Sequence, residues 1–386
     1  GVEFKTYYHV LDDTTSLGNN SVLSIYDDTK GNLWVGTTGG LQRLDRETDR
    51  FSTVHFSYPY ITDFSYVSCI IEDSRGNIWL STSRAGAICL KGDEHSPVYY
   101  LPTNSNICSD KINTIYEDRF GNIWIGSQDN GISVLNMETH TIVNYAHDPA
   151  DVNSLSSNKV FSFVELPDGN MLIGMIDGGI DLFDYSSKKF IRNYIPSVKG
   201  AFTLKEGKDN DVWIGTDGDG IYRLNADREV DRHYTADKLS AGVVLTIFED
   251  SRGRIWLGTY LHGLFLYDER SDSFQSIRLQ TGGREIKDIY IIEENTDGTL
   301  WIGTNDGGLN LYVPGAQKFI HYALQESQRE DGLGSNNIKS VYVDEPRGLV
   351  YIGAHAGGLS ILHRNSGRME NFNQLNSPLI NENVYA

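Results

Sequence analysis

Residues 121–127, Gly-Asn-Ile-Trp-Ile-Gly-Ser, decide the fold, because near copies of this stretch recur along the whole chain. All six tryptophans of the 386 residues occupy the Trp place of such a copy, and Leu172 and Tyr351 occupy that place in two more. The eight positions follow one another at steps of 45, 45, 48, 41, 43, 45 and 50 residues. A period near 45 with short strands and glycine-rich turns is typical of the blades of a β-propeller.

Each repeat is consistent with four short strands. An apolar run such as residues 22–26 is the innermost strand, and an Asp followed three residues later by Gly then suits a type I turn, as at Asp28 and Gly31. The Trp-x-Gly-Thr segment is a second strand buried on both faces. A glycine-rich hairpin leads to a third strand, and an aromatic pattern such as residues 319–322 marks a fourth. The sequence therefore predicts an all-β protein, a β-propeller of four-stranded antiparallel blades whose eight repeats form seven or eight blades.

A glycine stands two residues after the Trp place in seven of the eight copies, as at Gly36 and Gly126, and Ser81 replaces it in the second copy. A missing side chain permits close approach of the backbone to a neighbour. We expect the tryptophan of one blade to stack on the glycine of the next.

The two ends of the chain lie within a repeat. Residues 4–8 resemble a fourth strand without the three that precede it, and the chain stops at Tyr385-Ala386, inside the next innermost strand. We expect the strand near Phe4 to pair with the last blade, which would cover an exposed sheet edge. Residues 1–386 are predicted to form a single β-propeller domain that belongs to a longer, multidomain protein.

Composition excludes several classes of partner. The net charge of −19 and the pI of about 4.9 argue against nucleic acid and against direct contact with an anionic membrane, since both need basic patches. The sequence holds no apolar run long enough to span a bilayer. The three cysteines fit neither a disulfide framework nor a zinc motif. We therefore predict neither a cofactor nor a metal ion.

Two long runs carry a resemblance to a known family. Residues 24–41, from Ser-Ile-Tyr-Asp-Asp to Thr-Thr-Gly-Gly-Leu, and residues 115–132 resemble the two-component regulator propeller repeat. That repeat is best known from the periplasmic sensor regions of hybrid two-component systems in Bacteroidetes. The resemblance implies a periplasmic sensor that detects an oligosaccharide and controls glycan-utilisation genes. Its implied partners are neighbouring sensor domains, a second propeller or a second copy in a homodimer. The chain has about half the repeats usual for the twin-propeller sensor and no kinase motif.

The hairpins after the Trp-x-Gly-Thr segments differ from copy to copy, and loops on a rigid scaffold are where function usually lies. They supply an aromatic ring and planar hydrogen-bonding groups, which are the groups that bind sugar faces and hydroxyls. The candidate ligand-binding residues are Arg84, Asp129, Tyr260, His262, Asn305, Asp306 and His355. The alternative is that Asp or Asn before Gly serves the turn alone, which we favour for Asp177, Asp217 and Asp306.

Catalytic motifs are absent from the sequence: it has no Gly-x-Ser-x-Gly elbow, no His-Glu-x-x-His and no phosphate-binding loop. We therefore predict a non-enzymatic protein with no catalytic residues. Two alternatives stay open. The Gly-x-Ile-Trp rhythm is also similar to that of streptogramin-lyase-like propellers, in which case His262 or His355 would be the general base. The chain could also be a purely structural or dimerisation propeller.

Overall fold

Short β-strands make up nearly all of the computed structural model, which describes residues 3–7, 9–10, 13–48, 50–56, 66–91, 97–207, 209–281, 283–316, 318–324 and 333–364. One helix, α1 (Ala236–Leu239), lies in this part of the chain, and no helix in it is long and apolar enough to cross a membrane. The chain divides into two compact units, of which unit 1 comprises residues 1–70, 93–96 and 278–386, and unit 2 comprises residues 71–92 and 97–277.

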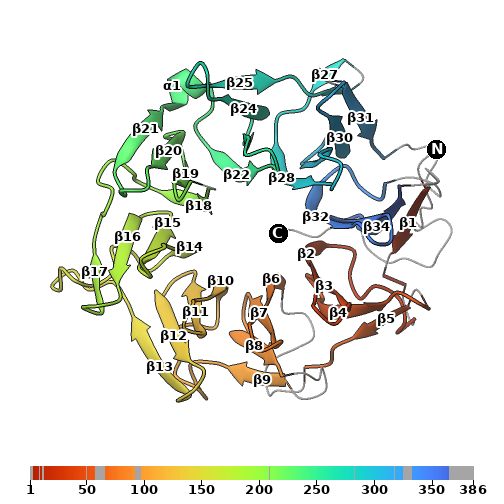
Figure 1. The fold of residues 1–386 in the computed structure, drawn as a ribbon. Coiled ribbons are helices and arrows are strands. Elements are labelled where there is room, and N and C mark those ends of the chain that lie inside the picture. The colour runs from red at the N-terminus through yellow and green to blue at the C-terminus, as the bar shows by residue number, and fades with distance from the viewer. Residues whose placement is uncertain are drawn as a thin grey trace. The chain divides into compact units, whose positions relative to one another are not determined.

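Unit 1 contains three four-stranded antiparallel sheets and a short hairpin (Figure 1). Blade 1 consists of β2 (Val22–Asp27), β3 (Leu33–Thr37), β4 (Gly40–Asp45) and β5 (Arg50–Thr53). Blade 7 consists of β28 (Ile289–Glu294), β29 (Leu300–Thr304), β30 (Leu309–Val313) and β31 (Lys318–Tyr322). Blade 8 consists of β32 (Ile338–Asp344), β33 (Leu349–Ala354), β34 (Gly358–His363) and β1 (Glu3–Tyr7), and the hairpin is formed by β26 (Gln280–Thr281) and β27 (Arg284–Glu285).

Unit 2 contains the other five sheets, except that Val67–Ile70 of β6 fall in unit 1. Blade 2 consists of β6 (Val67–Glu72), β7 (Ile78–Thr82), β8 (Ala87–Leu90) and β9 (Pro97–Tyr100), and blade 3 of β10 (Ile112–Glu117), β11 (Asn122–Ser127), β12 (Ile132–Asn136) and β13 (Thr141–Tyr145). Blade 4 consists of β14 (Val160–Glu165), β15 (Met171–Met175), β16 (Gly179–Asp184) and β17 (Lys189–Ile191). Blade 5 consists of β18 (Ala201–Glu206), β19 (Val212–Thr216), β20 (Ile221–Leu224) and β21 (Val230–Tyr234), and blade 6 of β22 (Val244–Glu249), β23 (Ile255–Thr259), β24 (Leu264–Asp268) and β25 (Ser273–Ile277).

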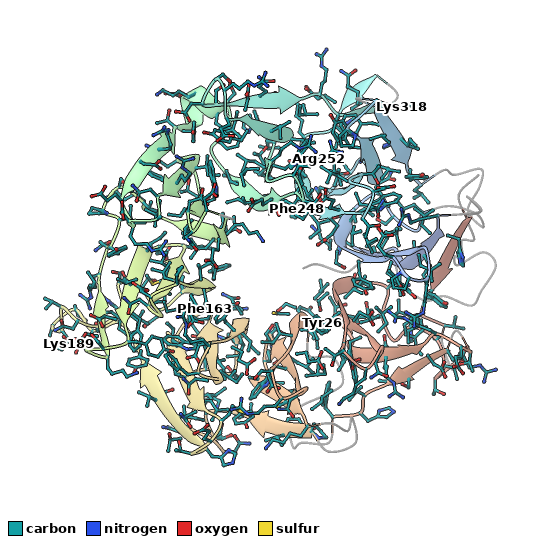
Figure 2. The ribbon with its side chains drawn as sticks, in the orientation of Figure 1. Tyr26, Phe163, Lys189, Phe248, Arg252 and Lys318 are labelled. Carbon is teal, nitrogen blue, oxygen red and sulfur yellow. The ribbon has the colours of Figure 1, made fainter. Side chains whose placement is uncertain are left out.

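The predicted β-propeller architecture is confirmed, with one blade for each of the eight repeats. The alternative of seven blades is therefore wrong. The predicted pairing of the first strand is also confirmed, because β1 pairs antiparallel with β34 from Glu3↔His363 to Tyr7↔Leu359. Figure 2 shows the two edges of a sheet in blade 4, where Phe163 lies on the first strand and Lys189 on the fourth.

Each tryptophan of the repeat is anchored to the turn that precedes it. In blade 3 the Asp118 carboxylate accepts hydrogen bonds from the backbone N–H groups of Phe120 at 2.9 Å and Asn122 at 2.8 Å. Its other oxygen accepts a hydrogen bond from the Trp124 indole at 2.9 Å. The turn role of the Asp was predicted, whereas the indole bond was not. Equivalent indole bonds, also of 2.9 Å, join Trp34 to Asp28, Trp79 to Asp73, Trp256 to Asp250 and Trp301 to Asn295.

The glycine two residues after the Trp place makes room for the next blade, but not for its tryptophan. A Cβ at Gly126 would lie 2.8 Å from Thr114 on the adjacent strand and 2.8 Å from Val160, the first residue of the next blade. In unit 1, Gly303 faces Ile291 and Ile338 in the same way. The expected stacking of Trp on Gly is therefore wrong: a branched aliphatic side chain from the next innermost strand fills the space.

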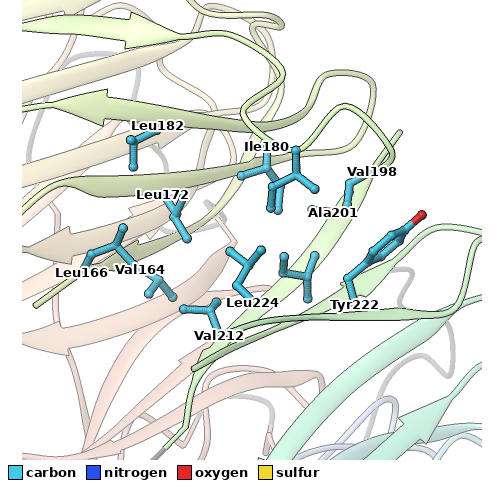
Figure 3. Close-up of a cluster of buried hydrophobic side chains, with 12 residues drawn as sticks. Val164, Leu166, Leu172, Ile180, Leu182, Val198, Ala201, Val212, Tyr222 and Leu224 are labelled. Atoms are coloured by element: carbon cyan, nitrogen blue, oxygen red, sulfur yellow. The ribbon is translucent and has the colours of Figure 1, made fainter. Parts of the chain in front are cut away.

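Neighbouring blades share their hydrophobic cores. Figure 3 shows one such cluster in unit 2, formed by side chains from blades 4 and 5. Leu172, in the Trp place of blade 4, and Ile214 of blade 5 are fully buried in this cluster. A layer of aliphatic and aromatic side chains between two sheets is the usual core of stacked repeats.

An acidic residue at the end of the innermost strand also joins neighbouring blades. Glu117 at the end of β10 accepts hydrogen bonds from the Ser74 backbone N–H at 2.6 Å and from the Ser74 hydroxyl at 2.7 Å. Glu165 at the end of β14 receives the Arg119 backbone N–H at 2.9 Å and forms an ion pair with the Arg119 side chain. In unit 1, Glu345 receives the Thr296 N–H at 2.6 Å. These bonds fix each turn against the blade that follows it.

The anchoring role of the turn carboxylate is testable at Asp73 in blade 2. We expect Asp73→Ala to lower the free energy of unfolding by about 3 kcal/mol, because the Trp79 indole and two turn N–H groups lose their acceptor in a buried place. Asp73→Asn should cost less, since Asn295 accepts the equivalent indole bond in blade 7. Urea unfolding measures both, with the exposed Asp227→Ala as control. Equal midpoints for Asp73→Ala and Asp227→Ala would contradict the role.

Candidate functional site

The hairpins between the second and third strands lie beside the connectors that precede the first strands. In blade 6 the Tyr260 N–H donates to the Val243 carbonyl at 3.1 Å, and in blade 8 the His355 N–H donates to the Asn337 carbonyl at 2.8 Å. In blades 1, 2, 5, 6 and 7 the threonine at the end of the second strand holds the hairpin in shape, and Ser127 does so in blade 3. In blade 7 the Thr304 hydroxyl donates to the Gly308 carbonyl and accepts from the Gly307 N–H, both at 2.9 Å. Backbone bonds fix these hairpins, together with a hydroxyl in most blades, so their other side chains are free to differ.

In unit 2 the structure places two of the candidate residues on the hairpins of blades 2 and 3. Arg84 is exposed, and Asp129 is half-buried. Asp129 accepts a hydrogen bond from the Ser109 hydroxyl at 2.7 Å and forms an ion pair of 2.8 Å with Lys111. These two partners hold the pKa of the Asp129 carboxyl below its usual value, against the opposing effect of burial. The Asp129 carboxyl is therefore ionised, and it is bonded to the connector that precedes β10.

Tyr260 and His262 stand together on the blade 6 hairpin of the same unit. The side chain of Tyr260 is 43% exposed, and Nδ1 of His262 lies 2.9 Å from the Tyr260 carbonyl oxygen. Leu261 between them is 49% exposed and has a left-handed backbone with φ of 67°. A bulky residue in that conformation costs about 1 kcal/mol. Strain of this kind is concentrated at functional sites, which favours the predicted role of this hairpin.

In unit 1 the candidates Asn305, Asp306 and His355 lie on the hairpins of blades 7 and 8. Asp306 forms an ion pair with Arg284 on β27, which agrees with the structural interpretation of this residue. Asn305 is half-buried, and its N–H donates to the Asp288 carbonyl at 3.1 Å. His355 is half-buried beside the connector residue Asn337.

A polar cluster surrounds His355, and we call it the Lys339 cluster: Asp288, Tyr290, Asn337, Lys339 and His355. The Lys339 ammonium lies 3.7 Å from the centre of the Tyr290 ring. Nδ1 of His355 and Oδ1 of Asn337 are both buried and have no hydrogen-bond partner among the described residues. A buried polar atom without a partner costs about 1–3 kcal/mol, so two such atoms in one cluster indicate that this place is adapted to a role other than stability.

Burial and charge shift the pKa values within this cluster. Burial lowers the pKa of the Lys339 ammonium, and the nearby Asp288 carboxylate partly opposes that shift. The pKa of the His355 imidazole is lowered from 6.5, first by burial and second by the positive charge of Lys339. His355 is therefore neutral near pH 7 and able to donate or accept one hydrogen bond.

A β-bulge brings Lys339 into this place, and sequence reasoning missed it. The register of β32 on β33 shifts between Ile338 and Ser340, so Lys339 is the extra residue. A bulge re-aims one side chain and is common next to functional sites. The same shift occurs at the second residue of six other innermost strands, at Leu23, Asn113, Phe161, Phe202, Leu245 and Tyr290. The sequence feature that could have revealed the bulge is that this one strand position varies between apolar, aromatic and charged residues.

The bulged residues contact one another within each unit. In unit 2 the rings of Phe161 and Phe202 meet edge to face at 6.1 Å. In unit 1 the corresponding contact is the ammonium of Lys339 over the ring of Tyr290. The chemistry at this position is thus apolar in blades 4 and 5 and polar in blades 7 and 8. Within the described ranges, no group of three or more His, Cys, Asp or Glu side chains is placed to hold a metal ion.

Comparison with known families identifies the repeat. The family model of the Two component regulator propeller matches residues 16–39, 63–84, 106–129 and 238–261, which fall on blades 1, 2, 3 and 6. The chain therefore contains two-component regulator propeller repeats, which confirms the predicted resemblance. No curated protein matches the chain.

Solved structures similar to this chain include extracellular domains of two component systems and other propellers. One is the extracellular domain of a hybrid two component system from B. thetaiotaomicron, with 25% identity and a TM-score of 0.41 over 96% of this chain and 54% of that chain. This chain thus spans about half the length of that relative. Virginiamycin B lyase from Staphylococcus aureus matches with 12% identity and a TM-score of 0.54 over 94% and 99% of the two chains. The Dos1 propeller matches with 12% identity and a TM-score of 0.61 over 96% and 98%. The last two likenesses show a common fold.

Because the positive charge of Lys339 helps to lower the His355 pKa, the titration of His355 should depend on Lys339. In the protein the His355 pKa should lie below 6.5, and Lys339→Met should raise it, because a positive charge that disfavours the imidazolium is removed. His321 is the internal control, since burial alone lowers its pKa and Lys339 does not contribute. NMR titration of the two imidazoles measures both values. An unchanged His355 pKa, or an equal rise at His321, would contradict the arrangement.

Proposed function

We propose that this chain is the ligand-sensing propeller of a hybrid two-component regulator, located in the periplasm, and that it recognises an oligosaccharide. The observation that carries the sensor part is the fourfold match to the two-component regulator propeller repeat. Each match covers a connector, a first strand, its turn and a second strand, which are the elements that build the hairpin face.

The chemistry of the hairpins supports an oligosaccharide as the ligand. Sugars are held by aromatic rings against their apolar faces and by planar groups that pair with hydroxyls. Tyr260 and His262 offer a ring and an imidazole in unit 2, and Asn305 and His355 offer an amide and an imidazole in unit 1. Asp129 and Asp306 are engaged in ion pairs with Lys111 and Arg284, so they contribute to binding only if those pairs open.

Signal transfer requires other parts of a sensor, and we propose three partners for it. These are a neighbouring sensor domain, a second propeller, or a second copy of this chain in a homodimer. The rigid hairpins would bind the ligand, and the partner would convert binding into a change in its arrangement relative to this chain. A ligand shifts such an equilibrium only by its difference in affinity for the two states.

Ligand-induced stabilisation tests this proposal. We expect at least one oligosaccharide from a panel of plant and host glycans to raise the melting temperature of this chain, because a ligand that binds only the native state stabilises it by mass action. Tyr260→Ala or His355→Ala should weaken the effect about tenfold, which corresponds to about 1.4 kcal/mol. Phe120→Ala is the matched control, because this aromatic ring is 59% exposed but lies in the turn between the first two strands. No stabilisation by any glycan would contradict the proposal.

One observation favours an enzyme as the second candidate. The imidazole of His355 has a lowered pKa and a buried Nδ1 without a described partner, so it is a neutral base near pH 7. A streptogramin-lyase-like reaction would then turn over a cyclic depsipeptide, and His355→Ala or His262→Ala would abolish it. Incubation of the purified chain with such a depsipeptide, followed by mass spectrometry, decides this candidate. Intact substrate after prolonged incubation excludes it.

A further inference from the structure

Lys339 is half-buried and differs from three exposed basic side chains near the hairpins. Lys111, Lys159 and Arg284 each form an ion pair with a hairpin aspartate, namely Asp129, Asp177 and Asp306. Lys339 has no carboxylate within 4.0 Å among the described residues, although the chain carries 52 acidic and only 33 basic residues. Its described contact is the face of the Tyr290 ring.

A half-buried ammonium without a counter-ion is an unfavourable arrangement in a free protein. Removing a charge from water costs free energy unless a partner compensates it, and a cation–π contact returns only about 0.5–2 kcal/mol. The same bulge holds an apolar residue elsewhere in the chain, such as Leu23 in blade 1. The scaffold therefore does not require a lysine at this place, and an anionic ligand group would supply the missing partner.

The unpartnered atoms of Asn337 and His355 narrow the class of possible ligands further. Oδ1 of Asn337 is an acceptor and needs a donor, and Nδ1 of His355 takes either role according to its tautomer. A simple inorganic anion offers acceptors only, and a neutral sugar offers hydroxyls without a charge. A sugar acid offers a carboxylate and neighbouring hydroxyls in one ring, so it matches all three groups.

We propose that the Lys339 cluster binds a hexuronate residue of an acidic oligosaccharide, with the carboxylate at Lys339 and hydroxyls at Asn337 and His355. This inference rests on the proposed function, because it names the class of oligosaccharide recognised by the hairpin side of unit 1. The ring of Tyr290 orients the ammonium from the other side. The Asp288 carboxylate acts on Lys339 from the connector of blade 7, so it limits the affinity for anions and favours a ligand that also donates hydrogen bonds.

Two ligands that differ only in whether their carboxyl groups are free or methyl-esterified give the sharpest test. Calorimetry would compare a short oligogalacturonide with its fully methyl-esterified form, using the full chain. We expect the acid to bind at least tenfold more tightly than the ester. Lys339→Met should remove that preference and leave the weaker affinity for the ester unchanged, whereas Lys339→Arg should retain much of it. Lys111→Met is the control, because this lysine directly precedes the innermost strand β10 and, unlike Lys339, forms an ion pair with a hairpin aspartate, Asp129. The melting temperatures of the unliganded variants check that each one is folded.

The outcomes separate this inference from the proposed function. Equal affinity for acid and ester, or an acid preference that survives Lys339→Met, overturns the hexuronate site while sugar binding stands. Preference for a sulfated oligosaccharide over the oligogalacturonide assigns the site to sulfate and overturns the carboxylate. Stabilisation by acetate with no binding of any sugar leaves only an anion site, which contradicts both proposals. An increase in the His355 pKa on binding the acid, absent with the ester, supports the carboxylate at Lys339.

Discussion

The hydrogen bond between a turn carboxylate and a buried indole is the interaction on which blades 1, 2, 3 and 6 depend. In blade 3 one Asp118 oxygen closes the turn and the other holds Trp124, so the turn, the second strand and the contact with the next blade are fixed by one side chain. The carboxylate also satisfies a donor that a wholly apolar core could not accommodate. Trp124 then presents its ring to Phe163 and Phe183 of blade 4, at 5.8 and 5.2 Å.

The blades that lack this pair show how the constraint is met by other means. In blade 5 a glycine, Gly207, stands where the carboxylate is expected, and the Asp211 carboxylate occupies the space beside it and hydrogen-bonds Trp213. In blade 8 the ring of Tyr351 replaces the indole, and Arg46 of blade 1 lies over it at 5.5 Å while pairing with Asp27 and Asp344. Each substitution is compensated by a side chain from the same turn or from an adjacent blade, so the four-stranded sheets stay alike.

The repeat made the strands predictable, whereas irregular features left little trace in the sequence. Trp124 and its equivalents predicted the second strand of each blade, because a rare residue at a fixed period marks a structural unit. The glycine two residues after the Trp place was predicted to contact the wrong neighbour. Spacing alone does not reveal that Val160, rather than a tryptophan, packs on Gly126. The bulge at Lys339 adds one residue to a strand without changing its composition, so pattern reasoning passes over it. His355 was found because turn chemistry does not explain a histidine there, but its partners Asn337 and Lys339 lie in a connector and a strand.

This scaffold suits recognition because backbone bonds hold its hairpins in place, which leaves most of their side chains free to vary. The hairpins are held by backbone bonds, such as that from His355 N–H to the Asn337 carbonyl, and in most blades by a hydroxyl at the end of the second strand, such as Thr304 in blade 7. The bulged residue of each innermost strand is held by the ladder on either side of it. Neither position needs a particular side chain for stability, so both tolerate the Phe161 of blade 4 and the Lys339 of blade 8 alike. A protein built in this way acquires a new ligand by substitution at a few such positions, and a half-buried charge without an ion pair, such as Lys339 on the ring of Tyr290, is the mark that such a substitution leaves.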